Sequence, residues 1–150
     1  MPFLGWIEVV FMYEKCVKKF GDSFYAIFRI VFGVLFLVHG LQKFGFLGGP
    51  GVAGFAAYLS IPVWLAVLVG LIEVITGLLI ALGLFTRTAS GIAAPYMVIV
   101  YIIGHLPKGI LPWNNGGELA VLYFAAFLAI HAKGAGIWCL EKALFKKERY

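Results

Sequence analysis

The chain has 150 residues, of which 63% are hydrophobic and 13% charged, and its mean hydropathy is +0.99. Soluble domains carry about 25% charged residues, so the composition excludes a soluble globular protein and predicts a single integral membrane domain. The net charge of +5 is clustered, which argues against a nucleic-acid partner. Cys16 and Cys139 are too few and too far apart for a disulfide framework or a CxxC redox pair. We expect no cleavable signal peptide, because residues 1–23 lack a compact apolar core followed by a cleavage site.

The first segment, residues 3–20, is amphipathic when it is placed on a helix. Its polar side carries Gly5, Glu8, Glu14, Lys15, Lys18 and Lys19. This pattern is typical of a helix that lies in the headgroup plane with its lysines toward anionic lipid. A docking helix for a partner subunit is the alternative. Gly21 is expected to break the helix, which predicts an interfacial helix over residues 1–21.

The first membrane span is expected over residues 24–44, because an apolar run of this length matches a hydrocarbon core of about 30 Å. A guanidinium inside such a run is costly unless it reaches the headgroups or finds a partner. One helical stripe collects the unusual residues of this span, namely Arg29, Gly33, Phe36, Gly40 and Lys43, with His39 at its edge. That stripe should therefore face protein rather than lipid.

Three further spans are expected over residues 63–85, 89–106 and 118–132, the last of which is short. Gly70, Thr76 and Gly77 share one face of the second span and should let a neighbouring helix approach closely. Residues 52–59 can form a short interfacial helix, and residues 133–150 form a basic tail. The fold class predicted is all-α, a four-helix membrane bundle preceded by an interfacial helix.

The basic residues predict the topology. If the N-terminus is cytoplasmic, that side receives nine Lys and Arg residues, and the other side receives Lys43 and Lys108 alone. This asymmetry predicts an even number of spans in the cell membrane, with both termini cytoplasmic.

With that topology, polar residues gather at the outer ends of the spans. They are His39, Gln42, Lys43, His105, Asn114 and Glu118, with Glu73 deeper and Arg29 lower still. We predict an outward-facing polar pocket in which His39, Lys43, His105 and Glu118 converge, above a buried carboxylate with a binding or proton-handling role. Alanines at 125, 129 and 132 lie beneath Glu118 and suggest that this side of the fourth span is packed.

Several alternatives stay open for these residues. Arg29 can either extend to the inner headgroups or pair with another helix, with Glu73 as the favoured partner. The charge state of Glu73 is open. His39 and His105 can each be an interface histidine with one hydrogen bond; a metal site with Glu118 is the lesser alternative, and we predict no metal.

Three stretches carry a family resemblance: FRIVFGVLFLVHGLQKFGFLGGPGVAGFAAYL, GLIEVITGLLIALGLFTR, and IGHLPKG with NGGELAVLYFAAFLAI. Together they resemble the DoxX family of small four-span membrane proteins, over roughly Phe24 to Ala132. The resemblance implies a four-helix bundle and, through relatives in thiosulfate:quinone oxidoreductase, a link to membrane redox systems. The sequence encodes no CxxC, haem-attachment or dinucleotide-binding motif of its own.

Two classes of function remain. The first is a membrane subunit of a redox complex that binds a quinone or a small sulfur substrate in the outward pocket and receives electrons from a partner. The second is a non-catalytic structural or assembly subunit that anchors a partner protein. Both imply contact with lipid and with other subunits or further copies of the chain.

Overall fold

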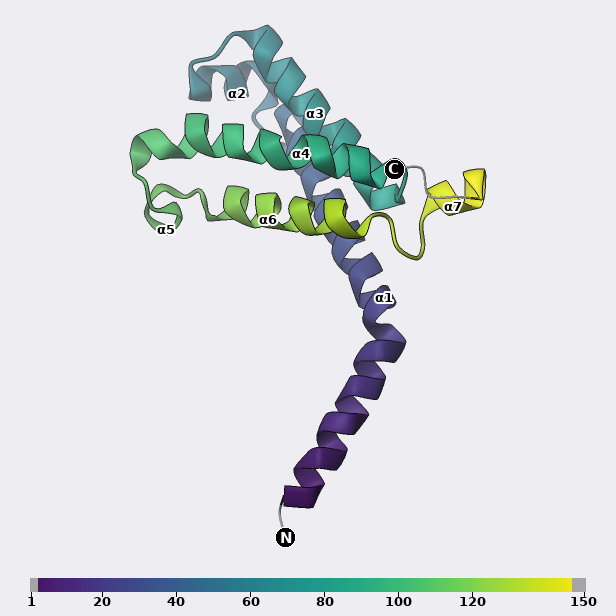
Figure 1. Ribbon diagram of the computed structural model, residues 1–150. Helices are drawn as coiled ribbons and strands as arrows, with labels where there is room; N and C mark the ends of the chain where they lie inside the picture. The colour runs from purple at the N-terminus through teal and green to yellow at the C-terminus, as the bar shows by residue number, and fades with distance from the viewer. Residues whose placement is uncertain (1–2, 147–150) are drawn as a thin grey trace.

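A computed structural model describes residues 3–146, with side chains from Met12 onward. These residues form helices and connecting turns without a strand, which confirms the all-α fold class. The α-helices are α1 (Phe3–Lys43), α2 (Gly51–Leu59), α3 (Val63–Leu82), α4 (Thr86–Val100), α5 (Pro112–Asn115), α6 (Glu118–Lys133) and α7 (Leu140–Phe145) (Figure 1). A 3-10 turn (Phe46–Gly48) precedes α2, and α4 continues into a π-helical turn (Tyr101–His105) and a 3-10 turn (Leu106–Lys108).

Three helical segments of the described chain are long and apolar enough to cross a membrane: Met12–Lys43, Val63–Leu82 and Thr86–Lys108. They coincide with the first three predicted spans and confirm that this is an α-helical membrane protein. The helix α6 also lies where a span was predicted, but its 16 residues measure only about 24 Å. That α6 crosses the membrane stays a prediction.

The helix α1 runs through Gly21 without interruption, so the predicted helix break at this residue is wrong. A glycine costs a helix only about 1 kcal/mol relative to alanine, and Gly21 is not among the glycines with positive φ. Residues 3–20 are helical, as expected, but they continue directly into the first span. Their placement on the membrane surface stays a prediction.

The core arrangement is two closely packed helix pairs, α1 with α3 and α4 with α6, joined by the contact between α3 and α4. The backbones of α1 and α3 touch at glycines. A Cβ atom built on Gly33 would lie 2.5 Å from the Ala81 nitrogen, and one on Gly77 would lie 2.5 Å from the Leu37 nitrogen. This confirms the predicted close approach at Gly77, which small residues permit.

The close approach gives a first testable prediction. We expect Gly77→Ala to lower the free energy of unfolding by about 1–3 kcal/mol, because the added methyl group forces the backbones of α1 and α3 apart. The matched control is Gly21→Ala, since a Cβ at Gly21 meets no atom within 4 Å. Unfolding of the detergent-solubilised protein, followed by circular dichroism, measures both. An equal response of the two variants would contradict the packing.

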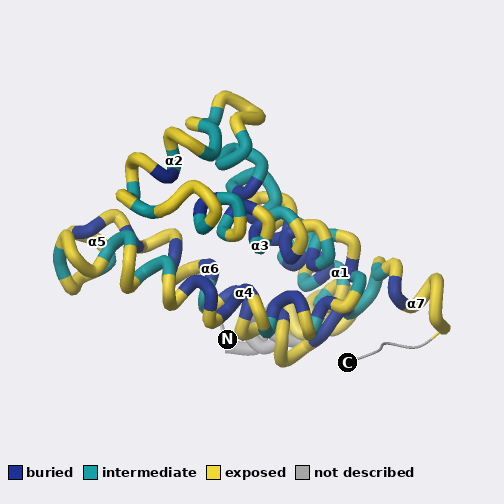
Figure 2. The backbone as a smooth tube through the Cα atoms, turned by 90° about the horizontal axis from the view of Figure 1, so that it is seen from above, coloured by how far each residue is buried: buried dark blue, intermediate teal, exposed yellow. Residues whose placement is uncertain are grey.

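The hydrophobic core lies where the two helix pairs meet. Phe36, Ile80, Ala93 and Phe127 are among its members. Buried and exposed positions alternate along α3, α4 and α6, so each of these helices has one buried side and one exposed side (Figure 2). On α6 the buried side carries Tyr123, Phe127 and Ile130.

The side of α6 predicted to be packed is exposed. Ala125, Ala129 and Ala132 all face outward, together with Glu118. The error has a physical cause: a stripe of small residues suits a close helix contact or a lipid-facing surface equally well. The aromatic stripe makes the larger van der Waals contacts with the neighbouring helices, as in the ring contacts of Tyr123 and Phe127 with Phe36, and is therefore the one that is buried.

The two ends of the bundle differ. We call the end that carries α2 and residues 106–117 the α2 end. The opposite end carries the turn between α3 and α4 together with residues 134–146, and we call it the tail end (Figure 1).

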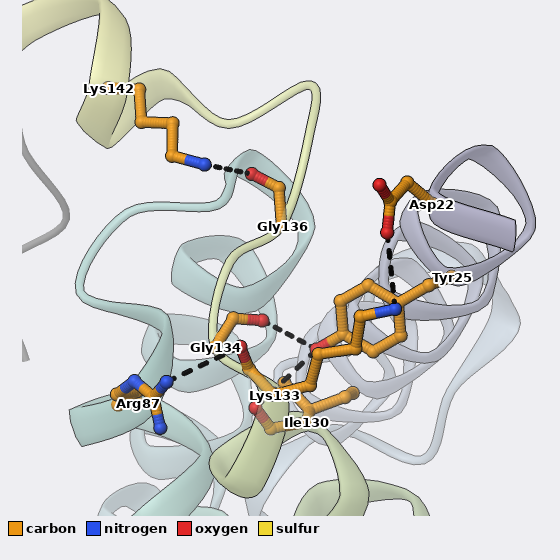
Figure 3. A network of polar contacts seen from close by, with 8 residues as sticks. All are labelled: Asp22, Tyr25, Arg87, Ile130, Lys133, Gly134, Gly136 and Lys142. Carbon is orange, nitrogen blue, oxygen red and sulfur yellow. Dashed lines mark hydrogen bonds and ion pairs between the residues drawn. The ribbon is translucent and has the colours of Figure 1, made fainter.

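Residues after α6 fold back against the tail end instead of forming a purely solvated tail (Figure 3). The Tyr25 hydroxyl donates to the carbonyl of Gly134 at 2.5 Å, and in the last turn of α6, just before these residues, Arg87 Nη1 donates to the carbonyls of His131 and Ala132 at 2.9 Å each. Glu141 is 2% exposed and accepts a hydrogen bond from the Phe85 backbone at 3.0 Å. Part of the predicted basic tail is therefore ordered structure.

Arg29 is completely buried at the tail end, as its stripe predicted, but its predicted partner is wrong. Its Nη1 donates to the carbonyls of Ile80 at 2.5 Å and Ala81 at 2.9 Å, and its Nη2 donates to that of Trp138 at 2.9 Å. These carbonyls include the last turn of α3, where the helix dipole is negative and favours a cation. Arg29 thus binds backbone, not Glu73.

Candidate functional site

A cavity of about 450 Å³ lies at the α2 end, between α3 and α4. The helices α3 and α4 converge at the turn that joins them and diverge toward the α2 end, and α2 closes part of the space between them (Figure 1). Most of the lining is apolar. The ionisable and hydroxyl-bearing side chains that reach the cavity are His39, Lys43, Tyr58, Glu73, Tyr96, His105 and Tyr123.

The carboxylate of Glu73 is the centre of a buried polar cluster. Lys43 Nζ donates to Oε2 at 2.5 Å, and the Tyr96 hydroxyl donates to Oε1 at 2.6 Å. Glu73 is 4% exposed and Tyr96 is 8% exposed. Both carboxylate oxygens thus have partners from neighbouring helices, which a buried carboxylate requires. We call Lys43, Glu73 and Tyr96 the carboxylate triad.

Two further polar groups beside the triad have capacity for a ligand. The hydroxyl of Tyr123 is buried and has no hydrogen-bond partner in the described chain. The edge of the His39 ring packs against the Tyr123 ring, with centroids 5.8 Å apart. A buried hydroxyl without a partner is costly, so a ligand oxygen placed near Tyr123 would remove that cost.

The mouth of the cavity is shaped by the π-helical turn Tyr101–His105. Nδ1 of His105 lies 3.3 Å from the carbonyl of Asn115, and the rings of Tyr101 and His105 stack. The Asn115 amide donates to the Gly109 carbonyl at 2.6 Å and to the Tyr101 hydroxyl at 3.1 Å, which fixes the loop before α6. Single π-helical turns inside α-helices are frequent at functional sites.

The helix α2 covers the cavity from the other side. Lys43 Nζ lies 4.8 Å from the centroid of the Phe55 ring, a cation–π distance. Lys108 Nζ donates to the Tyr58 hydroxyl at 3.1 Å and so joins α2 to the loop that follows α4. The short helix that was predicted over residues 52–59 is α2, which spans Gly51–Leu59.

The structure brings together only part of the predicted site. His39, Lys43, Glu73 and His105 line the cavity, and the predicted burial of Glu73 is confirmed. The predicted convergence of Glu118 with them is wrong, because Glu118 is exposed and does not line the cavity.

Three other candidate residues also lie elsewhere. Asn114 is exposed, whereas its neighbour Asn115 is buried. Gln42 is half-buried outside the cavity lining, and its backbone carbonyl accepts a hydrogen bond from Gly45 at 3.0 Å. Arg29 lies at the tail end. The predicted direction of the Gln42 and Asn114 side chains, into the pocket, is wrong, because neither side chain lines the cavity.

Sequence reasoning missed Tyr96 and Tyr123. A signal was present, because a tyrosine in the middle of an apolar helix has a hydroxyl that needs a polar partner when it is buried. Among residues 3–146, no three His, Cys, Asp or Glu side chains lie close enough together to hold a metal ion.

Comparison with known proteins identifies the family. The DoxX family model matches residues 24–106. An uncharacterised protein from Haemophilus influenzae is 37% identical over 139 residues, which cover 87% of this chain and 98% of that protein. A Bacillus subtilis protein named "Putative oxidoreductase CatD" is 27% identical over 121 residues, covering 81% of this chain and 87% of that one. No solved structure matches the chain. The protein belongs to the DoxX family of membrane proteins.

Proposed function

We propose that this protein binds a quinone headgroup in the cavity at the α2 end, as the membrane subunit of a redox complex. The observation that carries the proposal is the placement of the carboxylate triad and the partnerless Tyr123 hydroxyl in an otherwise apolar cavity. A quinone likewise has a polar part and an apolar part, because its ring carries two polar oxygens and its tail is apolar. The similarity to a protein named as an oxidoreductase supports the same class of activity.

The cavity favours a lipid-soluble ligand over a small sulfur anion such as thiosulfate. Leu68, Ile99 and Ile103 line the cavity and are 46%, 54% and 56% exposed, so this part of the apolar wall is accessible from outside. We propose that a lipid-soluble ligand enters the cavity along this wall. The charge of Lys43 is balanced by Glu73, so the site offers no spare cation to an anionic substrate.

The groups around the cavity suit the proton chemistry of a quinone. Reduction of a quinone to a quinol consumes two electrons and two protons. The Tyr123 hydroxyl can donate a hydrogen bond to a quinone oxygen, and the chain Lys43–Glu73–Tyr96 can relay a proton from the α2 end to the quinone. We propose that the electrons come from a partner oxidoreductase, because the sequence carries no motif for a redox cofactor.

Filling the cavity tests the proposal. Gly104 lines the cavity, and a Cβ added there meets no atom within 4 Å. We expect Gly104→Leu to place its side chain in the cavity and to weaken binding of a short-chain ubiquinone analogue at least tenfold. Isothermal titration of the purified protein in detergent measures this.

The matched control is Gly21→Leu, at a glycine with equal free space but outside the cavity, and it should bind like the wild type. Equal binding by Gly104→Leu and the wild type would place the quinone elsewhere. Absence of binding by the wild-type protein would favour the alternative function, a structural subunit that anchors a partner.

We further propose that the α2 end faces outward and that both termini are cytoplasmic. We therefore expect Asn114→Cys to react with a membrane-impermeant maleimide on intact cells, and Lys146→Cys to react only after lysis. Asn114 and Lys146 are both exposed at opposite ends of the structure, so burial does not limit the reaction. Both experiments use a background without Cys16 and Cys139. The reverse labelling pattern would contradict the topology and the outward orientation of the cavity.

A further inference from the structure

One side of α1 carries an exposed apolar seam whose residues are spaced alternately four and three positions apart. Its members are 40–69% exposed, and they are Tyr13, Val17, Phe20, Phe24, Ile27, Val31 and Val34. The same spacing continues back through the sequence at positions 10, 6 and 3, which hold Val, Trp and Phe. Seven-residue apolar periodicity sustained over four heptads is the signature of a coiled coil.

The opposite side of α1 changes its character along the helix. In the second half it is buried in the bundle at Ala26, Arg29, Gly33 and Phe36. In the first half the same side carries the charged residues, namely Lys15, Lys18, Lys19 and Asp22. Between residues 14 and 23, the large apolar residues occur only on the seam, at Val17 and Phe20. The seam is therefore continuous, and it faces away from both the bundle and the charges.

Lipid can cover only part of this seam. The unbroken α1 has 41 residues and measures about 60 Å, twice the thickness of a hydrocarbon core of about 30 Å. Residues 12–20 are all exposed, and the first half of α1 extends away from the other helices (Figure 1). In this inference the straight α1 projects its first half away from the bilayer, in place of the position on the membrane surface that the sequence predicts. Tyr13, Val17 and Phe20 therefore need another cover.

We infer that a second copy of this chain covers the seam, so that two α1 helices form a parallel coiled coil. Two copies inserted with the same topology present parallel helices, and identical positions then meet layer by layer without a change of register. Val17 and Val31 occupy a positions on either side of Phe24, and Phe20, Ile27 and Val34 occupy d positions, so each layer of the pair brings together two identical apolar side chains. The charged residues lie on the far side of each helix, so the lysines of the two copies are kept apart. This inference is independent of the cavity and its ligand.

Disulfide trapping in native membranes tests the inference with the full chain. In a background with Cys16→Ser and Cys139→Ser, we expect Val17→Cys and Phe20→Cys to form cross-linked dimers on oxidation. The matched controls, Lys15→Cys and Lys18→Cys, are at positions that are also exposed but lie on the opposite side. Cross-linking at the seam should exceed that of the controls at least fivefold. A functional check is quinone binding, which these distant substitutions should leave unchanged.

Each other outcome overturns the inference. Equal cross-linking on both sides would indicate random collisions between monomers. Cross-linking confined to the controls would place a different face of α1 at the interface. If seam cysteines remain uncross-linked but are shielded from a water-soluble maleimide while the controls react, the seam is covered by the membrane surface instead.

Discussion

Replacement of Arg29 by methionine is expected to lower the free energy of unfolding by about 3–5 kcal/mol. Arg29 is completely buried and donates short hydrogen bonds to the carbonyls of Ile80, Ala81 and Trp138. Hydrogen bonds to a charged group contribute about 1.5–3 kcal/mol each, and carbonyls left without a partner add a desolvation cost. Methionine keeps much of the packing volume, so the loss reports the hydrogen bonds. Unfolding of the detergent-solubilised protein, followed by circular dichroism, measures it.

The matched control for Arg29 is Arg87→Met. Arg87 also donates to three carbonyls, those of His131 and Ala132 at 2.9 Å and that of Lys133 at 3.4 Å, but these hydrogen bonds are exposed. Water replaces exposed hydrogen bonds, so this variant should lose no more than about 1 kcal/mol. If the two variants lost equal stability, the burial of Arg29 would not be what makes it important. If Arg29→Met had the same free energy of unfolding as the wild type, the hydrogen bonds assigned to Arg29 would be wrong.

The contrast between Arg29 and its predicted partner shows what the sequence can and cannot determine. Helical periodicity put Arg29 on a protein-facing stripe, and that was sufficient to predict its burial. The partner depended on how far α1 and α3 are shifted along each other, which periodicity does not reveal. The helices α1 and α3 run antiparallel, and Gly33 of α1 lies beside Gly77 of α3, while Gly40 of α1 lies beside Val74 of α3. This register places Arg29 at the end of α3, several turns from Glu73.

The same register explains why Lys43 is the partner of Glu73. Helical side chains point toward the N-terminus of their own helix, so Lys43 extends back along α1 to the depth of Glu73. Glycines on both helices were recognised as packing residues, but they were not used to align the helices.

The sequence predicted the level along the helices at which the cavity lies, but not all of the residues that line it. His39, Lys43 and His105 end their helices at one level, and the order of residues along the chain was sufficient to show this. Glu118 occupies a similar level but points outward, because α6 buries its aromatic side and not its alanine side. The direction of a side chain on a helix with apolar residues all round is determined by packing, which a single sequence does not specify.

Replacement of Glu73 by leucine is expected to damage both folding and binding. It leaves the Lys43 ammonium and the Tyr96 hydroxyl without their acceptor in a buried site. Removal of one partner from a buried ion pair costs about 3–5 kcal/mol, because the remaining charge is uncompensated. If the proposed function is correct, the variant also loses at least tenfold in affinity for the ubiquinone analogue. The single variant therefore does not separate a structural role from a binding role.

The double variant Lys43→Met with Glu73→Leu separates them. Replacement of a buried ion pair by apolar residues of similar volume is often neutral or stabilising, so we expect most of the lost stability to return. Quinone affinity should stay at least tenfold reduced, because the apolar pair cannot hold Tyr96 in place and removes two polar groups from the cavity wall. Unfolding and isothermal titration of the same samples measure the two properties. If stability and quinone affinity both returned, the carboxylate triad would serve only to join the helices, and the protein would be better described as a structural subunit.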